Sequence, residues 1–127
     1  MANNQLPTDP ISVVQAFNNC INNQDNGGLA ALMSKNHTFI DRDGSSHGPK
    51  SHMVEGWKQF FEMFPLYKNT FTEIKAAENR VFVLGYAYWS EKEPYDPVIW
   101  TARIEGNLIA EWRVYEDSDE NRKKFNF

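Results

Sequence analysis

The spacing of apolar residues changes at Pro65, and this change constrains the fold more than any other feature of the sequence. Before Pro65, apolar residues recur every three to four positions, which is typical of amphipathic helices. After Pro65 they recur at every second position, which is typical of strands with one buried face. Helices followed by consecutive strands predict an α+β domain, with the helices packed on a mainly antiparallel sheet.

Three helices are expected before Pro65. The first begins at Asp9-Pro10, because the carboxylate can cap free N–H groups and proline suits the first turn. It ends where Asn26-Gly27-Gly28 breaks the repeat, and a second, shorter helix follows. The third helix begins after Gly48-Pro49 and has the most marked apolar stripe in the chain, which consists of Met53, Trp57, Phe60, Phe61 and Phe64.

Five strands are expected around these helices. A short one, His37 to Asp41, precedes the third helix and runs into a cluster of turn-forming residues. Four more follow Pro65, separated by segments that favour turns, and they lie near 68–77, 80–90, 97–105 and 108–117. We expect these strands to form a strongly curved sheet that wraps over the three helices as a cone.

Length and composition indicate one globular domain over residues 1–127, with a core from about 9 to 118 and a short, solvated C-terminal tail. The formal net charge of −4 gives no broad positive field, so neither nucleic acid nor an anionic membrane is an expected partner. No apolar run is long enough to cross a membrane, and the start of the chain lacks the pattern of a secretory signal. A cytoplasmic location is therefore expected.

Four segments occur in an order that is similar to one known family. They are the helix end Asn22-Asn23-Gln24-Asp25, the strand and turn from His37 to Gly44, the aromatic helix from Gly48 to Pro65, and the last strand from Glu111 to Asp117. Together they resemble a SnoaL-like member of the nuclear transport factor 2 superfamily, which includes ketosteroid isomerase. The resemblance implies a cystatin-like cone around one apolar pocket. It leaves the function open, because the superfamily includes isomerases, cyclases, hydrolases and transport adaptors.

Asp41 is the first candidate for catalysis. Its place at the end of the first strand resembles that of the general base in ketosteroid isomerase, which moves a proton next to a carbonyl group. The resemblance aligns Phe17 and Trp100 with the two acidic donors of that enzyme, so the same steroid reaction is not expected. The alternative is that Asp41 only begins a turn. His47 and His52 flank Pro49, and we expect them at the pocket mouth, where they would shuttle protons.

Two other kinds of site are not expected. Limonene epoxide hydrolase, which has the same implied fold, needs two aspartates and an arginine, but Val114 takes the place of its last-strand aspartate. A metal site is not expected either, because the spacing of His37, His47 and His52 fits no helical two-histidine motif. We interpret these histidines as neutral residues at the surface or at the pocket rim.

Strand alternation assigns residues to the two faces of the sheet. In the last strand the apolar side chains would face the helices, so Glu111, Arg113 and Tyr115 would lie on the outer face. These three suit an isologous contact between two copies of the chain, whereas the alternative is a solvated face. The expected pocket residues are Phe17, Trp57, Phe61, Tyr86, Tyr88, Trp100, Trp112 and Val114, although aromatic residues also fill packed cores.

From these features we expect a homodimeric domain without a cofactor that binds a small, largely apolar organic molecule in its cone. One alternative is a proton-transferring isomerase or cyclase that uses Asp41 as its base. Another is an adaptor for protein interactions, which would use the outer surface. The three differ in their needs, because an enzyme requires an ionisable group in the pocket, a binding protein requires apolar volume, and an adaptor requires an exposed apolar patch.

Overall fold

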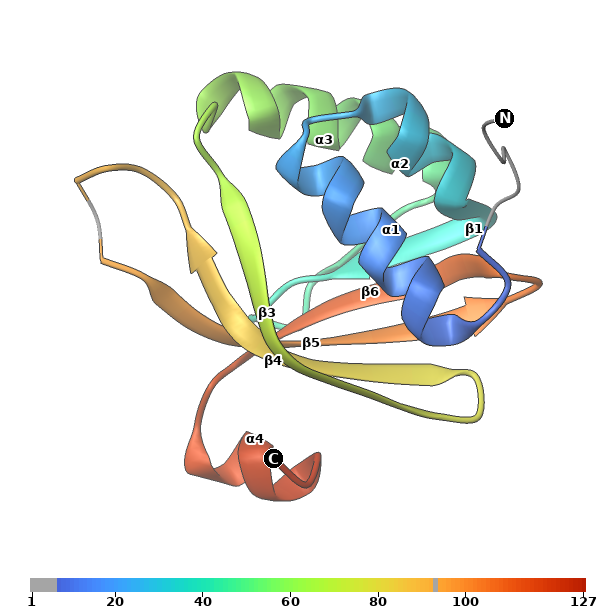
Figure 1. Ribbon diagram of the computed structural model, residues 1–127. Coiled ribbons are helices and arrows are strands. Elements are labelled where there is room, and N and C mark those ends of the chain that lie inside the picture. The colour runs from blue at the N-terminus through green and yellow to red at the C-terminus, as the bar shows by residue number, and fades with distance from the viewer. Residues whose placement is uncertain (1–6, 93) are drawn as a thin grey trace, which may run out of the picture.

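The computed structural model describes residues 7–92 and 94–127, and it contains a six-stranded sheet that curves around three helices (Figure 1). The helices are α1 (Pro10–Asn22), α2 (Asn26–Leu32), α3 (Lys50–Met63) and a short α4 (Asp119–Lys124). The strands are β1 (Met33–Ile40), β2 (Ser46–His47), β3 (Lys68–Ala77), β4 (Arg80–Tyr88), β5 (Asp96–Glu105) and β6 (Leu108–Glu116).

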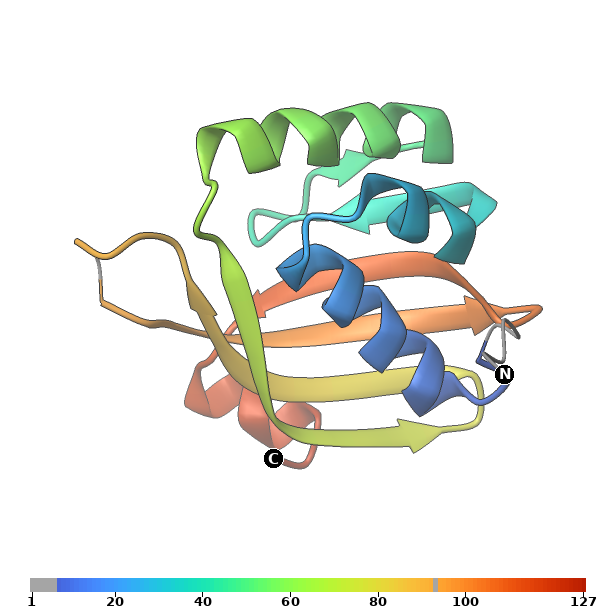
Figure 2. The same ribbon diagram turned by 45° about the horizontal axis from the view of Figure 1, so that its top comes forward.

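The sheet has the strand order β2-β1-β6-β5-β4-β3. Strands β3 to β6 form an antiparallel meander, and β1 joins its edge parallel to β6. Helices α1, α2 and α3 lie on one face of the sheet, whereas α4 lies on the other (Figure 2). The predicted α+β class and the cone of helices within a curved, mainly antiparallel sheet are therefore confirmed.

Strands β3 and β4 bend strongly along their length (Figure 1). The register between these strands shifts between Phe71 and Glu73, as in a β-bulge. Gly85 on β4 faces this irregularity, and a Cβ atom there would lie 2.0 Å from the carbonyl oxygen of Thr70. Only glycine permits this close backbone approach, so Gly85 allows the sheet to bend over the helices.

The core lies between the helices and the inner face of the sheet. From α1 it contains Val13, Val14, Phe17 and Ile21, all fully buried. Each such side chain contributes about 1.5–3 kcal/mol by leaving water. Helix α3 and the strands complete the core with Met53, Trp57, Phe61, Val81, Val83, Val98, Trp100, Ala102, Ile109 and Trp112.

Helix α1 is also joined to the start of β3 by a polar clamp. The backbone N–H of Asn69 donates to Oδ1 of Asn22 over 2.8 Å, and the Asn22 amide donates back to the Asn69 carbonyl over 2.9 Å. The side chain of Asn18 donates to the same carbonyl over 3.3 Å. Because β3 begins beside the cavity described below, this clamp positions one of its walls.

Two local predictions were wrong. Asn26-Gly27-Gly28 is the first turn of α2 rather than a break, because the Asp25 carboxylate accepts from the N–H of Gly28 over 2.9 Å and caps the helix. Strand β1 begins at Met33, directly after α2. At the C-terminus, Arg122, Lys123 and Lys124 are exposed, whereas Phe125, directly after α4, packs on Phe82 and Tyr115 of the sheet.

No helix within residues 7–92 and 94–127 is long and apolar enough to cross a membrane. The expectation that the chain lacks a secretory signal rests partly on residues 1–6, which lie outside the described residues. The expected turn between the predicted strands near 80–90 and 97–105 likewise includes one residue, at position 93, outside them.

Candidate functional site

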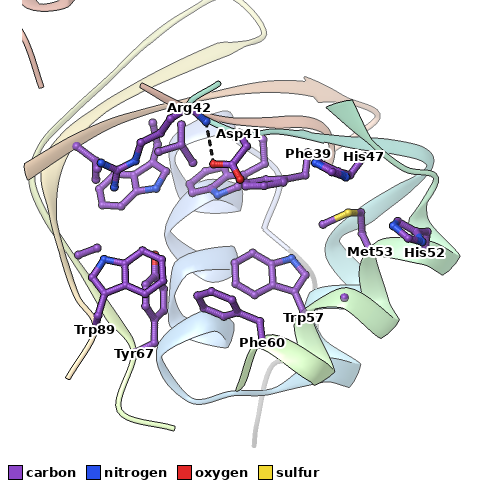
Figure 3. Close-up of a pocket in the computed structure, with 16 residues that line it drawn as sticks. Phe39, Asp41, Arg42, His47, His52, Met53, Trp57, Phe60, Tyr67 and Trp89 are labelled. Atoms are coloured by element: carbon purple, nitrogen blue, oxygen red, sulfur yellow. Dashed lines mark hydrogen bonds between the residues drawn. The ribbon is translucent and has the colours of Figure 1, made fainter. Parts of the chain in front are cut away.

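A cavity of about 300 Å³ lies between α3 and the inner face of the sheet (Figure 3). It is found where β1 and β4 end and where β3 and β5 begin, so that side chains from distant parts of the sequence meet there. Most of its wall is aromatic or aliphatic. The apolar lining consists of Phe39, Met53, Gly56, Trp57, Phe60, Ala87, Trp89, Val98, Trp100, Trp112 and Val114.

Four of the predicted pocket residues line this cavity: Trp57, Trp100, Trp112 and Val114. Phe17 and Phe61 do not line it, because helix packing places them deeper in the core. The Phe17 ring is fully buried and packs on Trp112 with a centroid distance of 5.2 Å. Phe61 packs on Trp57 with a centroid distance of 5.5 Å.

The prediction that Tyr86 and Tyr88 face the pocket is wrong. In β4 the buried positions are Val81, Val83 and Ala87, so the two tyrosines alternate to the opposite face of the sheet. There the Tyr86 ring packs on the exposed ring of Tyr95 at a centroid distance of 4.7 Å.

Asp41 lies at the cavity, directly after β1. Its backbone forms a turn, since its N–H donates to the Ser45 carbonyl over 3.0 Å and its own carbonyl accepts from Gly44 over 2.9 Å. One carboxylate oxygen, Oδ1, accepts from the backbone N–H of Arg42 over 2.8 Å. The side chain points toward the aromatic walls (Figure 3). Asp41 therefore forms the turn that the alternative interpretation expected, and its side chain also lines the cavity.

His47 and His52 also line the cavity, near its exposed rim. Nε2 of His47 lies 3.0 Å from the hydroxyl oxygen of Ser45, and its ring lies near that of Phe39. His37 is not a surface or rim residue, because its side chain is 1% exposed and belongs to the core. Among the described residues, no three His, Cys, Asp or Glu side chains gather as metal ligands would.

An ion pair spans the cavity rim and was not predicted. Arg42 donates from both terminal nitrogens to the two carboxylate oxygens of Asp96 at the start of β5, in one case over 3.1 Å. Nε1 of Trp89 donates to the same carboxylate over 3.2 Å. Burial lowers the pKa of Arg42, but the hydrogen bonds and charge of Asp96 outweigh this effect and raise it. Arg42 is therefore a cation whose charge is already paired.

Tyr67 is a second cavity residue that sequence reasoning missed. It lies in the short link between α3 and β3, where no periodic pattern assigns a face to a side chain. Burial raises the pKa of its hydroxyl well above the ordinary value. Nearby Asn69 and Arg42 lower the pKa by less than burial raises it, so the group stays protonated at neutral pH.

The predicted dimer face lies on the opposite side of the sheet from the cavity. Glu111, Arg113 and Tyr115 are all half-buried there. The Arg113 guanidinium lies 4.7 Å from the centre of the Tyr115 ring, and Phe125 packs on that ring with a centroid distance of 4.9 Å. Helix α4 therefore covers part of this face.

Comparison with solved structures shows the same fold in distant relatives. An uncharacterised cystatin-fold protein from Novosphingobium aromaticivorans is 13% identical, with a TM-score of 0.78 over 87% of this chain and 100% of its own. A nuclear transport factor 2-like protein of unknown function from Cytophaga hutchinsonii is 12% identical, with a TM-score of 0.74 over 99% of this chain and 100% of its own.

An LEH-like epoxide hydrolase from M. tuberculosis is 17% identical, with a TM-score of 0.74 over 85% of this chain and 82% of its own. At such low identities these matches establish the fold alone. No curated protein matches the sequence. The profile of the SnoaL-like domain, however, matches residues 14–112, which include most of α1, the elements from α2 to β5 and the first half of β6. The chain therefore belongs to the SnoaL-like domain family and has the cystatin-like, nuclear transport factor 2-like fold.

Proposed function

We propose that this protein binds a small, largely apolar organic molecule in the cavity beneath α3. The observation that carries this proposal is a cavity of about 300 Å³ with aromatic walls, a volume at the lower end of the range for small-molecule pockets. Trp100 and Trp112 lie in a stacked arrangement with their centroids 6.3 Å apart, and Trp57 also lines the cavity. Such walls suit a flat aromatic ligand, which would contact the rings by offset or edge-to-face packing.

Gly56 supports the proposal, because it leaves space on the helix that covers the cavity. It lines the cavity from the middle of α3, and a Cβ atom at this position would meet no other atom within 4 Å. No close contact therefore requires glycine here. A larger side chain at this position would extend into the cavity and compete with a ligand.

A titration with 2-acetylnaphthalene, followed by tryptophan fluorescence, tests the proposal. We expect saturable quenching in the unmodified protein and an affinity at least tenfold lower in Gly56→Leu. Gly27→Leu is the matched control, because Gly27 is exposed in α2 and does not line the cavity. An absence of saturable binding, or equal affinities in the two leucine variants, would contradict the proposal.

A second candidate function is proton transfer next to a carbonyl group. It is favoured by the Asp41 carboxylate, which lines the same cavity and uses one oxygen for the Arg42 N–H. The other oxygen would remove a proton from the carbon next to the carbonyl, leaving an enolate whose negative charge lies on the carbonyl oxygen. Return of a proton from Asp41 to carbon would complete an isomerisation or an exchange.

Hydrogen–deuterium exchange distinguishes this reaction from binding alone. In D2O, proton transfer would replace the methyl protons of the acetyl group with deuterons, which NMR measures directly. We expect exchange above the buffer rate in the unmodified protein and none in Asp41→Asn, which retains an oxygen for the Arg42 N–H. Exchange at the buffer rate with the ligand bound would leave binding as the function and refute the proton transfer.

A further inference from the structure

Tyr67 supplies the one hydroxyl group among the described residues that line the cavity. Its backbone N–H donates to the Phe64 carbonyl over 3.1 Å at the end of α3. Its ring is held edge-on between the rings of Phe60 and Trp89, each at a centroid distance of 4.8 Å. The side chain is 7% exposed, so its position on the wall is fixed by packing.

One polar side chain beside this hydroxyl, that of Asn69, lacks a hydrogen-bond partner within the described chain. The Tyr67 hydroxyl takes part in none of the side-chain hydrogen bonds found there. The neighbouring Asn69 is 3% exposed and its amide lowers the pKa of Tyr67, yet neither the amide nitrogen nor its oxygen has a partner of good geometry. Buried polar groups are almost always paired, so the unpaired Asn69 amide indicates that a further polar partner binds at this end of the cavity.

The protonation state of Tyr67 and the pairing of Arg42 indicate which ligand groups this end of the cavity can bind. Because the hydroxyl stays protonated, it has a hydrogen to donate. Asn69 lowers the pKa of Tyr67 by less than burial raises it, so the hydroxyl keeps the hydrogen that a carbonyl oxygen of a ligand would accept. Arg42 lines the cavity too, but Asp96 engages both of its terminal nitrogens, so the charge of Arg42 is not free to pair with a carboxylate ligand.

We infer that Tyr67 is the specificity-determining residue of this pocket and donates a hydrogen bond to a carbonyl oxygen of the ligand. The aromatic walls would hold the apolar body, and Tyr67, backed by Asn69, would orient the oxygen. This inference rests on the proposed binding function and names its ligand class, a neutral aromatic ketone or a related carbonyl compound. It does not depend on catalysis by Asp41.

Two ligands of the same shape test the inference. In 2-isopropenylnaphthalene a CH2 group replaces the carbonyl oxygen of 2-acetylnaphthalene. We expect Tyr67→Phe to weaken binding of the ketone about five- to tenfold, as the loss of one hydrogen bond does, and to change binding of the hydrocarbon less than twofold. Tyr88→Phe is the control, because that tyrosine lies on the outer face of the sheet and should alter neither affinity.

Infrared spectroscopy of the bound ketone gives a readout that packing alone would not move. The carbonyl stretching band should lie at a lower frequency in the unmodified protein than in an apolar solvent. It should return toward the apolar value in Tyr67→Phe. If that variant does not fold, the band of the ketone bound to the unmodified protein still decides the question.

The outcomes separate the two claims. If both ligands bind but Tyr67→Phe weakens them equally, or if the carbonyl band equals that in apolar solvent, Tyr67 is only a packing residue and the inference is wrong while the binding function stands. If neither ligand binds the unmodified protein, both the binding function and the inference fall.

Discussion

His37 is the histidine whose environment differs most from the surface or rim position predicted for it. Its ring lies in the core, 6.1 Å from the Phe17 ring by centroids, and its Nδ1 lies 2.7 Å from the Ile109 carbonyl oxygen. We assign the Nδ1–H tautomer, since a carbonyl can only accept. Burial lowers the pKa of His37, and the hydrogen bond to Ile109 offsets only part of this effect.

This environment predicts a pH-dependent stability. Because the folded pKa is depressed, the contribution of neutral His37 is complete above the unfolded value of about 6.5 and is lost as the pH falls below it. Urea unfolding should therefore show a free energy of unfolding lower by up to about 2 kcal/mol at pH 5 than at pH 7. His37→Gln, which cannot titrate, should remove most of this difference, and His52→Gln at the rim should preserve it. An equal dependence of the free energy of unfolding on pH in the two variants would contradict the assignment of this effect to His37.

Single residues show where sequence reasoning succeeds and where it fails. Trp100 and Trp112 could be assigned to the inner face because polar residues alternate with apolar ones in their strands. Strand β4 has apolar side chains on both faces, so the sequence does not indicate which face is buried. Tyr86 was therefore predicted on the wrong face. Tyr67 and Arg42 follow the ends of regular elements, where only the three-dimensional structure reveals which way a side chain points.

At the scale of elements, Gly56 affects both the stability of α3 and the space in the cavity. A glycine in a helix interior lowers the free energy of unfolding by about 0.5–1 kcal/mol relative to alanine. No close contact at position 56 requires the absence of a Cβ atom. The empty space beside it belongs to the cavity.

We therefore predict that Gly56→Ala raises the free energy of unfolding by about 0.5–1 kcal/mol, because a Cβ atom fits without a clash. Chemical denaturation measures this change. Gly85→Ala is the opposite case and should destabilise the protein, since its Cβ atom would collide with the Thr70 carbonyl. A loss of stability in Gly56→Ala would show that the position is more crowded than the structure indicates.

Most of the longer elements could be predicted because each has a clear period. Helix α4 could not, because six residues are too few for a periodic signal and helices of that length are not stable alone. Its stability comes from tertiary contacts and from a cap. The hydroxyl of Ser118 accepts from the N–H of Asn121 over 3.1 Å, and the Phe125 ring packs on Phe82 at 5.7 Å and on Tyr115 at 4.9 Å by centroids.

At the scale of the whole molecule, the two faces of the sheet contact different parts of the structure. The inner face forms the core and the cavity, while the outer face carries α4 and the residues predicted to pair two copies of the chain. The adaptor alternative would need an exposed apolar patch. The exposed large apolar side chains among the described residues are Met63, Leu66 and Tyr95.

The homodimer stays a prediction, and α4 restricts how it can form. Because Phe125 already covers part of Tyr115, pairing would use mainly Arg113 and Glu111 beside α4. Sedimentation equilibrium at micromolar protein concentration should show a dimer that Arg113→Glu converts to a monomer, because like charges would then meet across the two-fold axis. Arg80→Glu, an exposed charge reversal on β4, is the control. A monomer in the unmodified protein would refute the prediction.

The central claim of this account is that the aromatic cavity beneath α3 holds a small organic molecule. The most direct measurement is a crystal structure of the protein soaked with 6-bromo-2-acetylnaphthalene, in which anomalous scattering locates the bromine independently of any interpretation of the density. The account predicts one ordered bromine in the cavity beside Trp57 and Trp112, with the carbonyl oxygen in hydrogen-bond contact with the Tyr67 hydroxyl. Bromine bound only on the outer face of the sheet, or a cavity that stays empty at saturating ligand, would contradict it.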